Sequence, residues 1–256
     1  MGFSPAWLDL REPADLAARD ADLCARGAAA AGPAPVVVDL GAGTGASLRA
    51  LTPYLAAGAR WRLVDADAGL LALAQRRHDA VTPFVMDLRD IAALPLEGAT
   101  LVTASALLDL MPEDWVTALA AHLAARGLPF LAMLSYDGVM AWDPALPGDD
   151  AVTAAFNRHQ GGDKGLGPAL GPASGARTAA IFRAAGFDVA VADSPWRLGA
   201  DQTALQRDLV AGIAQAAAET GLAGAAEWGA ARVAAAGTTA CLIGHTDVLA
   251  VPGARA

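Results

Sequence analysis

A glycine-rich turn after a short apolar segment is the part of this sequence that points most directly to chemistry. The residues Gly41, Gly43 and Gly45 alternate with small residues and follow the run VVVD at 36–39. Glycine has no side chain, so the backbone of such a turn approaches a ligand closely. The amphipathic segment that follows points its free N–H groups at the same space. The pattern predicts a site for a nucleotide-type cofactor at the carboxyl edge of a sheet.

Three acidic residues stand at the ends of consecutive predicted strands. Asp39 lies two residues before the first glycine, Asp65 closes a segment at 61–64, and Asp87 closes one at 82–86. A carboxylate has two acceptor oxygens and so satisfies both hydroxyls of a ribose. The glycine spacing also fits a dinucleotide site, with Asp65 where a ribose-binding acid is expected. An acid after a strand is also often only a helix cap or a turn residue.

These residues need a framework of strands and helices to bring them together. Apolar segments predict five strands, at 36–39, 61–64, 82–86, 99–104 and 129–134. Helices are predicted at 69–77 and at 112–126, the second starting with a proline and ending before Gly127. Strands and helices that alternate in this way are typical of an α/β fold with a doubly wound parallel sheet.

The rest of the chain departs from this alternation. One helix is predicted before the first strand, at 14–31. Residues 138–175 are rich in glycine, proline and aspartate, with one short helix at 151–160. Beyond them the periodicity predicts three helices and two strands, at 176–185, 202–220, 225–235, 187–191 and 238–251. The long last strand suits an antiparallel pairing at the end of the sheet.

The motifs DLGAGTG, LVDAD and VMDL together resemble those of class I S-adenosylmethionine-dependent methyltransferases. The resemblance covers residues 34–136 motif by motif, and the last strands by topology. It implies a doubly wound sheet of seven mostly parallel strands, with helices on both faces, an antiparallel last strand and a small cap inserted after strand 5. We expect one domain, 1–256, made of an N-terminal helical segment (1–33), a cofactor-binding core (34–137), a substrate cap (138–175), and C-terminal helices and final strands (176–256).

The resemblance implies that the cofactor is S-adenosylmethionine, with S-adenosylhomocysteine as product. The turn residues would border the methionyl part of the cofactor: Asp39, Gly41, Ala42, Gly43 and Gly45. Ala104 and Ser105, at the end of strand 4, would approach the same group. An arginine of the N-terminal segment, Arg11 or Arg19, would meet its carboxylate.

The nucleoside part would lie against the ends of strands 2 and 3. The resemblance implies that Asp65 accepts hydrogen bonds from both ribose hydroxyls and that Ala66 and Asp67 flank the adenine. Asp87 and Leu88 would line the adenine, and the carboxylate can accept from its exocyclic amine.

Two residues near the carboxyl ends of strands 4 and 5 are candidates for contact with a methyl acceptor. Asp109 lies in SALLDLMPEDW, which resembles the loop of small-molecule methyltransferases and lacks the Asn/Asp-Pro-Pro-Tyr type of motif found in enzymes acting on bases or glutamine side chains. Asp109 is either a pocket acid or a polar residue before the helix. Tyr136 either faces the pocket or packs under the cap.

A polar cluster at 156–165 falls where such folds place their substrate cap. Asn157, Asp163 and Lys164 are candidates for substrate contact, and His159 is the candidate catalytic base, since imidazole titrates near neutral pH. The simpler interpretation is a solvated helix end followed by a polar loop. The histidines elsewhere are expected to be structural: His78, His122 and His245.

Composition excludes several classes of partner. The net charge is −9 and no basic stripe is present, so nucleic acid is a poor candidate. Cys24 and Cys241 are far apart in apolar settings and are expected to be reduced core residues. No metal-ligand spacing, signal peptide or membrane-spanning run is seen, so no metal, no membrane and a cytoplasmic location are expected. The oligomeric state cannot be deduced from the sequence.

These expectations combine into one main functional hypothesis and two alternatives. The main hypothesis is methyl transfer from S-adenosylmethionine to a small-molecule metabolite, with an oxygen or nitrogen acceptor favoured over carbon. A base is needed only if the acceptor carries a proton. The first alternative is a regulatory or partner protein that binds the cofactor without turnover. The second is an NAD(P)-dependent dehydrogenase.

Overall fold

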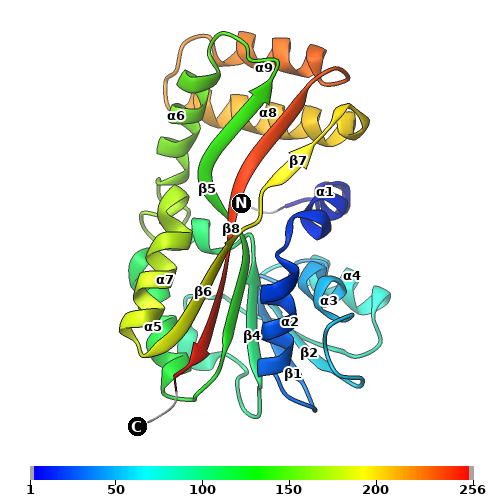
Figure 1. Cartoon of the computed structure of the whole chain (residues 1–256), viewed down its shortest axis with the longest axis vertical. Helices are drawn as coiled ribbons and strands as arrows, with labels where there is room; N and C mark the ends of the chain where they lie inside the picture. The colour runs from blue at the N-terminus through cyan, green and yellow to red at the C-terminus, as the bar shows by residue number, and fades with distance from the viewer. Residues whose placement is uncertain (1–2, 254–256) are drawn as a thin grey trace.

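A computed structural model describes residues 3–253 of the chain. The molecule is elongated, with a sheet and its covering helices at one end and a smaller lobe at the other (Figure 1). Two long strands, β5 (Phe130–Asp143) and β8 (Ala240–Pro252), run through both parts. The lower sheet and the upper lobe therefore share one framework.

The lower sheet has the strand order β3-β2-β1-β4-β5-β8-β6. The pairs within β1 to β5 are parallel, and β8 is antiparallel to both of its neighbours. The remaining strands are β1 (Val36–Leu40), β2 (Arg60–Asp65), β3 (Val81–Val85), β4 (Leu101–Ser105), β6 (Phe187–Asp193) and β7 (Trp196–Leu198). The expected mostly parallel sheet with an antiparallel last strand is confirmed. The structure adds β7, a short strand that pairs with the upper part of β8.

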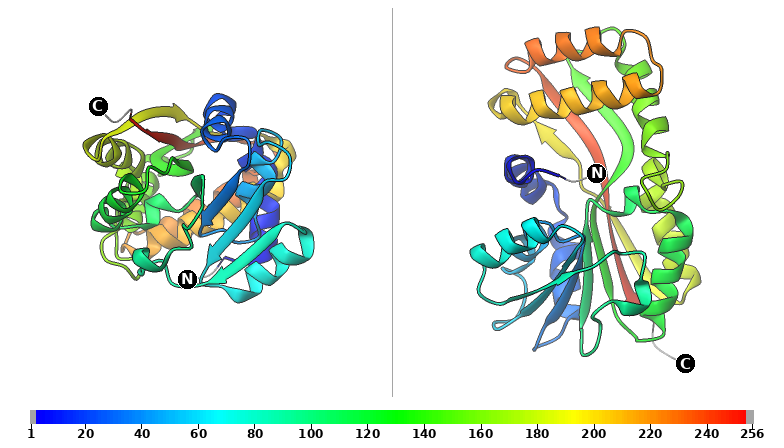
Figure 2. Two further views of the ribbon diagram at one scale, coloured as in Figure 1. Left: turned by 90° about the horizontal axis from the view of Figure 1, so that it is seen from below. Right: turned by 180° about the vertical axis from the view of Figure 1, so that it is seen from behind.

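Helices cover both faces of the lower sheet (Figure 2). On one face, Phe182 of α7 (Ser174–Ala184) stacks on Phe130 with ring centroids 5.0 Å apart, and α5 (Glu113–Ala124) packs beside it. On the other face lie α2 (Ala21–Ala30), α3 (Ala46–Leu51) and α4 (Ala68–Arg77). Two apolar layers thus hold the carboxyl ends of β1 to β4 in place. Among the helices of residues 3–253, none has a stretch both long and apolar enough to span a bilayer.

Strand 5 is longer than predicted. The expected strand ends at residue 134, whereas β5 continues to Asp143. The reason is local: Leu134 has a left-handed backbone (φ 56°), and the register with β8 shifts there and again after Tyr136. A bulge of this kind interrupts the apolar alternation while the strand continues, because pairing with β8 resumes beyond it.

The N-terminal region contains two helices where one was predicted at 14–31. Helix α1 (Pro5–Ala18) begins earlier, with Ser4 as its cap. Helix α2 then starts afresh because the carboxylate of Asp20 accepts a hydrogen bond from the N–H of Leu23 at 2.8 Å. The break leaves Arg19 between the two helices.

The upper lobe is built around the outer ends of β5 and β8, with β7, α6 (Asp149–Gln160), α8 (Thr203–Glu219) and α9 (Ala225–Ala235). Its core is separate from those of the lower sheet and is rich in tryptophan. Trp142 and Trp228 meet edge to face at 5.7 Å, and the guanidinium of Arg232 lies 4.8 Å from the ring of Trp142. The lobe is therefore larger than a cap made of 138–175 alone, because α8, α9 and β7 contribute to it.

Candidate functional site

The glycine turn joins the end of β1 to α3 and adopts a backbone that requires glycine. Gly41, Gly43 and Gly45 all have positive φ angles, of 65°, 53° and 86°. The N–H of Ala42 donates to the carbonyl of Val64 at 3.0 Å, which holds the turn against β2. A side chain at Gly41 would come within 3.2 Å of Leu107. The absence of a side chain at Gly41 therefore lets Leu107 pack against the turn at the carboxyl edge of the sheet.

Asp65 lies at the carboxyl end of β2 and faces this turn. One of its oxygens accepts a hydrogen bond from the N–H of Gly43 at 2.8 Å, and the other accepts from the N–H of Asp67 at 2.9 Å. Asp67 in turn caps α4 by accepting from the N–H groups of Gly69 and Leu70. Asp65 thus lies where strand 2 meets the glycine turn, as the motif spacing predicts, while Asp67 has a structural role as a helix cap.

Asp87 follows β3 on the same edge of the sheet. Its carboxylate accepts from the N–H of Arg89 at 2.9 Å and pairs with the Arg89 guanidinium at 2.8 Å. Both side chains are exposed. The pair is a turn arrangement that leaves Asp87 accessible beside Leu88, so contact with an adenine stays a prediction for both residues.

Asp39 is completely buried at the end of β1. Its Oδ1 accepts a hydrogen bond from the hydroxyl of Thr103 on β4 at 2.7 Å, and its Oδ2 has no partner within residues 3–253. Burial raises the pKa of Asp39 to about 6. A carboxylate with an unsatisfied oxygen under the glycine turn is suited to a nearby cationic or hydrogen-bond-donating group.

Arg19 reaches the same edge of the sheet from the break between α1 and α2. Its Nη2 donates to the hydroxyl of Ser105, the last residue of β4, at 2.8 Å. The side chain is buried, and its Nε and Nη1 have no hydrogen-bond partner in the described part of the chain. Burial lowers the pKa of this guanidinium, and the carboxylates of Asp15 and Asp247 oppose that effect. Two unpartnered donors on a buried cation are suited to an anionic ligand group.

Helix α1 lies over the glycine turn. Glu12 of α1 forms an ion pair with Arg49 of α3, and the Nη1 of Arg49 donates to the carbonyl of Thr44 within the turn at 2.6 Å. A second pair joins Asp9 of α1 to Arg77 of α4 at 2.7 Å. The same helix also contacts β7 of the upper lobe. Helix α1 therefore bridges the two parts of the molecule beside the turn.

A cavity of about 160 Å³ lies between α1, the carboxyl ends of β4 and β5, and the upper lobe; we call it the inner cavity. Ala106 and Leu134 form part of its wall, and both have a left-handed backbone (φ 50° and 56°). Strained residues of this kind often mark functional sites. Apolar and aromatic side chains supply most of the lining. The polar lining residues are Arg11, Asp109, Tyr136, Gln160 and His245.

Asp109 is a buried acid in the wall of the inner cavity. It lies on the short 3₁₀ helix Leu108–Leu110 that follows β4. Its Oδ1 has no partner among the residues described. Burial raises its pKa to about 6, while Arg11 and Lys164 act in the opposite direction. Of the two sequence interpretations, the position in the cavity favours a pocket acid.

Tyr136 also lines the inner cavity. Its hydroxyl donates to the side-chain oxygen of Asn157 at 2.7 Å, and the Asn157 amide donates to the carbonyl of Gly138 at 3.0 Å. Asn157 therefore orients Tyr136 and does not itself line the cavity.

The other members of the polar cluster at 156–165 point elsewhere. His159 meets Glu219 of α8 at 3.0 Å, and Lys164 donates to the carbonyl of His159 at 2.9 Å. Asp163 accepts from the N–H groups of Gly165 and Gly167, which closes an exposed turn. None of these three polar residues lines the inner cavity. The geometry thus favours the simpler interpretation, a solvated helix end with a polar loop, and gives no support to His159 as a base.

His245 lines the inner cavity, although the sequence suggested only a structural role. It lies on the same face of β8 as Cys241 and Ile243, which are buried in the core of the upper lobe. Its ring packs 5.2 Å from that of Trp196. Burial lowers the pKa of His245 to about 3, so the imidazole is neutral. The signal available in the sequence was the alternation of inward-facing residues along an unusually long last strand.

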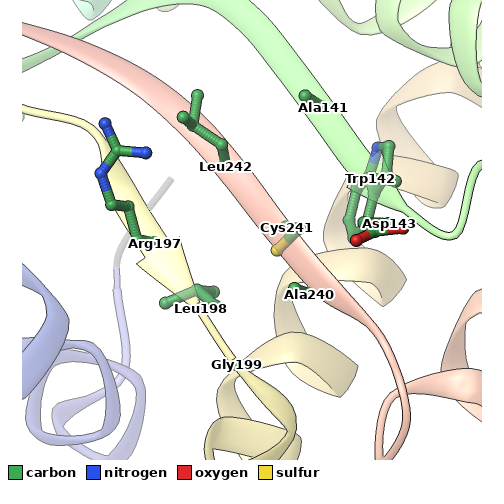
Figure 3. Close-up of a pocket in the computed structure, with 9 residues that line it drawn as sticks. All are labelled: Ala141, Trp142, Asp143, Arg197, Leu198, Gly199, Ala240, Cys241 and Leu242. Carbon is green, nitrogen blue, oxygen red and sulfur yellow. The ribbon is translucent and has the colours of Figure 1, made fainter.

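A second hollow of about 420 Å³ lies far from the turn, on the strands of the upper lobe (Figure 3). Asp143 of β5 and Arg197 of β7 lie at opposite sides of it, with Leu242 of β8 between them. Burial raises the pKa of the thiol of Cys241 in this hollow to about 12, so the thiol is unreactive at neutral pH. The hollow brings together no acid–base pair suited to catalysis. In addition, no group of three or more potential metal ligands occurs within residues 3–253.

Part of the chain matches a known protein family. A family model described as "Methyltransferase domain" matches residues 37–128, the segment that holds the glycine turn and the three acids. No sequence among the curated proteins matches the chain. The family match therefore favours the methyltransferase hypothesis over the nicotinamide one.

Solved structures share the fold at low sequence identity. A putative type II methyltransferase from Anaeromyxobacter dehalogenans is 19% identical, with 92% of this chain and 98% of that one covered and a TM-score of 0.50. A possible exported protein from Bordetella parapertussis is 17% identical, with 97% and 70% covered and a TM-score of 0.51. A geranyl diphosphate methyltransferase in complex with S-adenosylmethionine is 13% identical, with 91% and 84% covered and a TM-score of 0.49. At these identities the first two likenesses concern the fold alone.

Proposed function

We propose that this chain, a class I S-adenosylmethionine-dependent methyltransferase, transfers the methyl group to an oxygen or nitrogen atom of a small-molecule metabolite. The observation that carries the proposal is the inner cavity, which lies directly beyond the end of β4 and contains Asp109 and Tyr136. Its volume of about 160 Å³ leaves room for a group of the size of one ring. The net charge of −9 argues against a nucleic-acid acceptor.

The residues at the carboxyl edge of the sheet fit the cofactor. When bound, S-adenosylmethionine supplies an electrophilic methyl group on a cationic sulfur. Glycine at 41, 43 and 45 keeps Cβ atoms off the turn, where Leu107 and Leu8 already lie 3.2 and 3.4 Å from the positions that Cβ atoms of residues 41 and 43 would take. Asp65 holds this turn and carries the acceptor oxygens that a ribose requires.

Arg19 is the best candidate for the methionyl carboxylate. Its two unpartnered nitrogens are buried beside Ser105, so an anion there would satisfy donors that are otherwise unpaired. Asp39, also with a free oxygen, would oppose the positive charge of the sulfonium and ammonium groups. The adenine would lie against Ala66 and Leu88.

The work of this chain in methyl transfer is chiefly to hold the reacting atoms in line. Positioning alone supplies much of the rate in a displacement of this type. Helix α1 spans the turn and the upper lobe through Glu12–Arg49 and through Arg11, which lines the inner cavity. We infer that this helix covers the cofactor and the acceptor together and keeps water from both.

We propose that the chain divides into a cofactor-binding and a substrate-binding part. We propose that residues 34–137 form the cofactor-binding core and that residues 138–175 belong to the substrate-binding part. The inner cavity is also lined by Leu209 and Ile213 of α8, so we add α8 to the substrate-binding part.

Two measurements on the 256-residue chain test the proposal. Isothermal titration calorimetry with S-adenosylhomocysteine should show binding, with NAD as a control that shows none. Incubation with methyl-labelled S-adenosylmethionine and a metabolite extract should then place label in small molecules. Label found only in protein or nucleic acid would overturn the small-molecule assignment while leaving cofactor binding intact.

A further inference from the structure

The inner cavity has two buried polar groups that lack partners. Oδ1 of Asp109 and Nδ1 of His245 make no hydrogen bond within the described chain. Asp109 comes from the segment after β4, and His245 comes from the outer half of β8. The two residues are 7% and 6% exposed and the two unpartnered atoms are buried, so bulk water does not compensate them. Buried polar groups normally find partners, and a pair of exceptions in one cavity points to a ligand.

Asp109 is the one charged group in the lining of the inner cavity, as described, that has no counter-ion within the wall. The guanidinium of Arg11 forms two hydrogen bonds with Asp15, at 3.0 and 3.1 Å, and lies 4.9 Å from the ring of Trp196. Its charge is therefore compensated within the wall. Tyr136 is neutral because burial raises its pKa, and His245 is neutral because burial lowers its pKa. A ligand with a net charge of its own would find no free counter-ion other than Asp109.

The remaining wall is aromatic and aliphatic. Trp7, Tyr136, Phe156 and Trp196 line the inner cavity, and the rings of Tyr136 and Phe156 meet edge to face at 5.4 Å. An apolar cavity of roughly 150 Å³ is large enough to bind benzene. The inner cavity, at about 160 Å³, therefore suits a group of the size of one ring.

We infer that the methyl acceptor is an uncharged, ring-bearing hydroxyl compound, with its hydroxyl at Asp109 and a further polar group at His245. This inference rests on the proposed function, since it names the acceptor of that reaction. Asp109 is then a catalytic residue that accepts a proton. His245 determines specificity through a hydrogen bond of its neutral imidazole.

The chemistry of Asp109 favours a hydroxyl over an amine. An ammonium ion has no lone pair until it has lost its proton, and it would add a second positive charge beside the sulfonium. A hydroxyl attacks with its own lone pair and becomes strongly acidic only as the new bond forms. A carboxylate is basic enough to accept the proton at that stage.

The transfer step balances with these groups. The acceptor oxygen forms a bond to the methyl carbon while the carbon–sulfur bond breaks, and the electron pair of that bond goes to sulfur. The hydroxyl proton goes to the carboxylate of Asp109. The products are a methyl ether, a neutral thioether and a protonated Asp109, which later returns its proton to water.

Three probes that share one aromatic ring test the inference: 4-methylphenol, benzylamine and benzoate. Their dissociation constants are measured by ligand-observed NMR on the full chain saturated with S-adenosylhomocysteine. We expect 4-methylphenol to bind at least about 5-fold more tightly than benzoate, because a second carboxylate beside Asp109 would find no counter-ion. We also expect it to bind at least as tightly as benzylamine, because the desolvation of a buried ammonium–carboxylate pair offsets the attraction between the two charges. Tighter binding of benzylamine or benzoate would overturn the inference.

Variants of Asp109 and His245 test the role proposed for each residue. Asp109→Asn should abolish most turnover of the hydroxyl probe while the affinity for S-adenosylhomocysteine stays unchanged. His245→Leu should weaken binding of 4-hydroxybenzyl alcohol, which carries a second polar group, by about 5- to 10-fold, and should barely change binding of 4-methylphenol. Equal effects on both probes would show that His245 acts only through packing, and His245→Gln serves the same comparison if the leucine variant does not fold.

Matched controls are available in the chain. Asp137→Asn changes a half-buried acid next to Tyr136 that does not line the inner cavity, and His122→Leu changes a histidine of α5. Both should leave probe binding unchanged. If S-adenosylhomocysteine binds but no variant alters probe binding, the inference about the acceptor is wrong and the proposed function still stands. If wild-type protein labels only macromolecules, both the inference and the proposed function are wrong.

Discussion

The guanidinium of Arg19 donates a hydrogen bond to the hydroxyl of Ser105 at 2.8 Å and so links the break between α1 and α2 to the last residue of β4. The break is held in place from both sides. Asp20 caps α2, and its own N–H donates to the carboxylate of Asp247 at 2.9 Å. The arrangement places a buried cation with two unpartnered nitrogens at the carboxyl edge of the sheet.

Replacement of Arg19 tests its assignment to the methionyl carboxylate. Arg19→Met should weaken binding of S-adenosylhomocysteine by roughly 10- to 100-fold, since a charge-assisted hydrogen bond is lost. Binding of 5′-methylthioadenosine, which has no methionyl carboxylate, should change little. Calorimetry with the two ligands measures the difference. A parallel loss for both ligands would mean that Arg19 acts on the fold of the site.

Asp65 should contribute to binding of the nucleoside part of the cofactor. Asp65→Ala removes the acceptor of the Gly43 N–H and the expected acceptor of the ribose hydroxyls, so affinity for S-adenosylhomocysteine should fall by about 10-fold or more. Asp90→Ala is the control, because Asp90 caps only a short 3₁₀ helix. Unchanged affinity in the Asp65 variant would show that the ribose lies elsewhere.

The Glu12–Arg49 ion pair should slow exchange of the cofactor. Both side chains are mostly buried, and Arg49 also holds the carbonyl of Thr44 in the glycine turn. Glu12→Gln should raise the dissociation rate of S-adenosylhomocysteine by about 3- to 10-fold in stopped-flow experiments, because a helix held by a weaker contact opens more often. Asp22→Asn removes an exposed pair with Arg26 and should leave the rate as it is.

Asp109 should make both activity and stability depend on pH near 6. Its folded pKa of about 6 exceeds the ordinary value of 3.8, so its contribution to stability is complete below about pH 4 and is lost as the pH rises to 6. The loss is at most about 3 kcal/mol. Relative to wild type, Asp109→Asn should therefore gain stability between pH 4 and 7, as measured by urea unfolding.

The pH dependence of turnover should also reflect Asp109, but turnover should rise with pH where the stability contribution of Asp109 falls. Since the carboxylate is the proton acceptor, kcat/KM for a hydroxyl acceptor should rise with pH through about 6 and then level off. Arg11 and Lys164 act electrostatically on Asp109, and Tyr136 and His245 line the same cavity. Burial raises the pKa of Tyr136 and lowers the pKa of His245 to about 3, so both stay neutral near pH 6. A profile that is flat from pH 5 to 8 would argue against Asp109 as the base.

Arg232 should hold the upper lobe together. It is buried, pairs with Asp149, donates to the carbonyl of Pro144 at 2.9 Å and lies over Trp142. Arg232→Met should lower the free energy of unfolding by on the order of 3–5 kcal/mol, because Asp149 loses its charged partner. Arg177→Met, which breaks an exposed pair with Glu113, should lower the free energy of unfolding far less, because water screens that pair. Similar losses in both variants would contradict the role given to Arg232.

The lower sheet could be predicted because its signals are local. The valines of β1, the glycine turn and the acids that end β2 and β3 all lie within short segments, and parallel pairing brings strand ends to one edge without further information. The contact between Asp65 and the Gly43 N–H follows from that geometry.

The inner cavity could not be predicted in the same way. Asp109 and His245 are 136 positions apart in sequence, and they meet at one cavity only because β5 and β8 continue past the sheet. The bulge at Leu134 concealed that continuation. The polar cluster at 156–165 was conspicuous in composition, but His159 turns to Glu219 on α8, a partner that no local pattern reveals.

The most direct test of small-molecule methylation at the inner cavity is the fate of labelled methyl groups. Wild-type protein and Asp109→Asn are each incubated with methyl-tritiated S-adenosylmethionine and a metabolite extract free of protein and nucleic acid. Our expectation is label in a small neutral product with wild type, and a loss of at least about 100-fold with the variant, while both proteins bind S-adenosylhomocysteine equally. Equal labelling by the two proteins, or no small-molecule product from a wild type that binds S-adenosylhomocysteine, would contradict it.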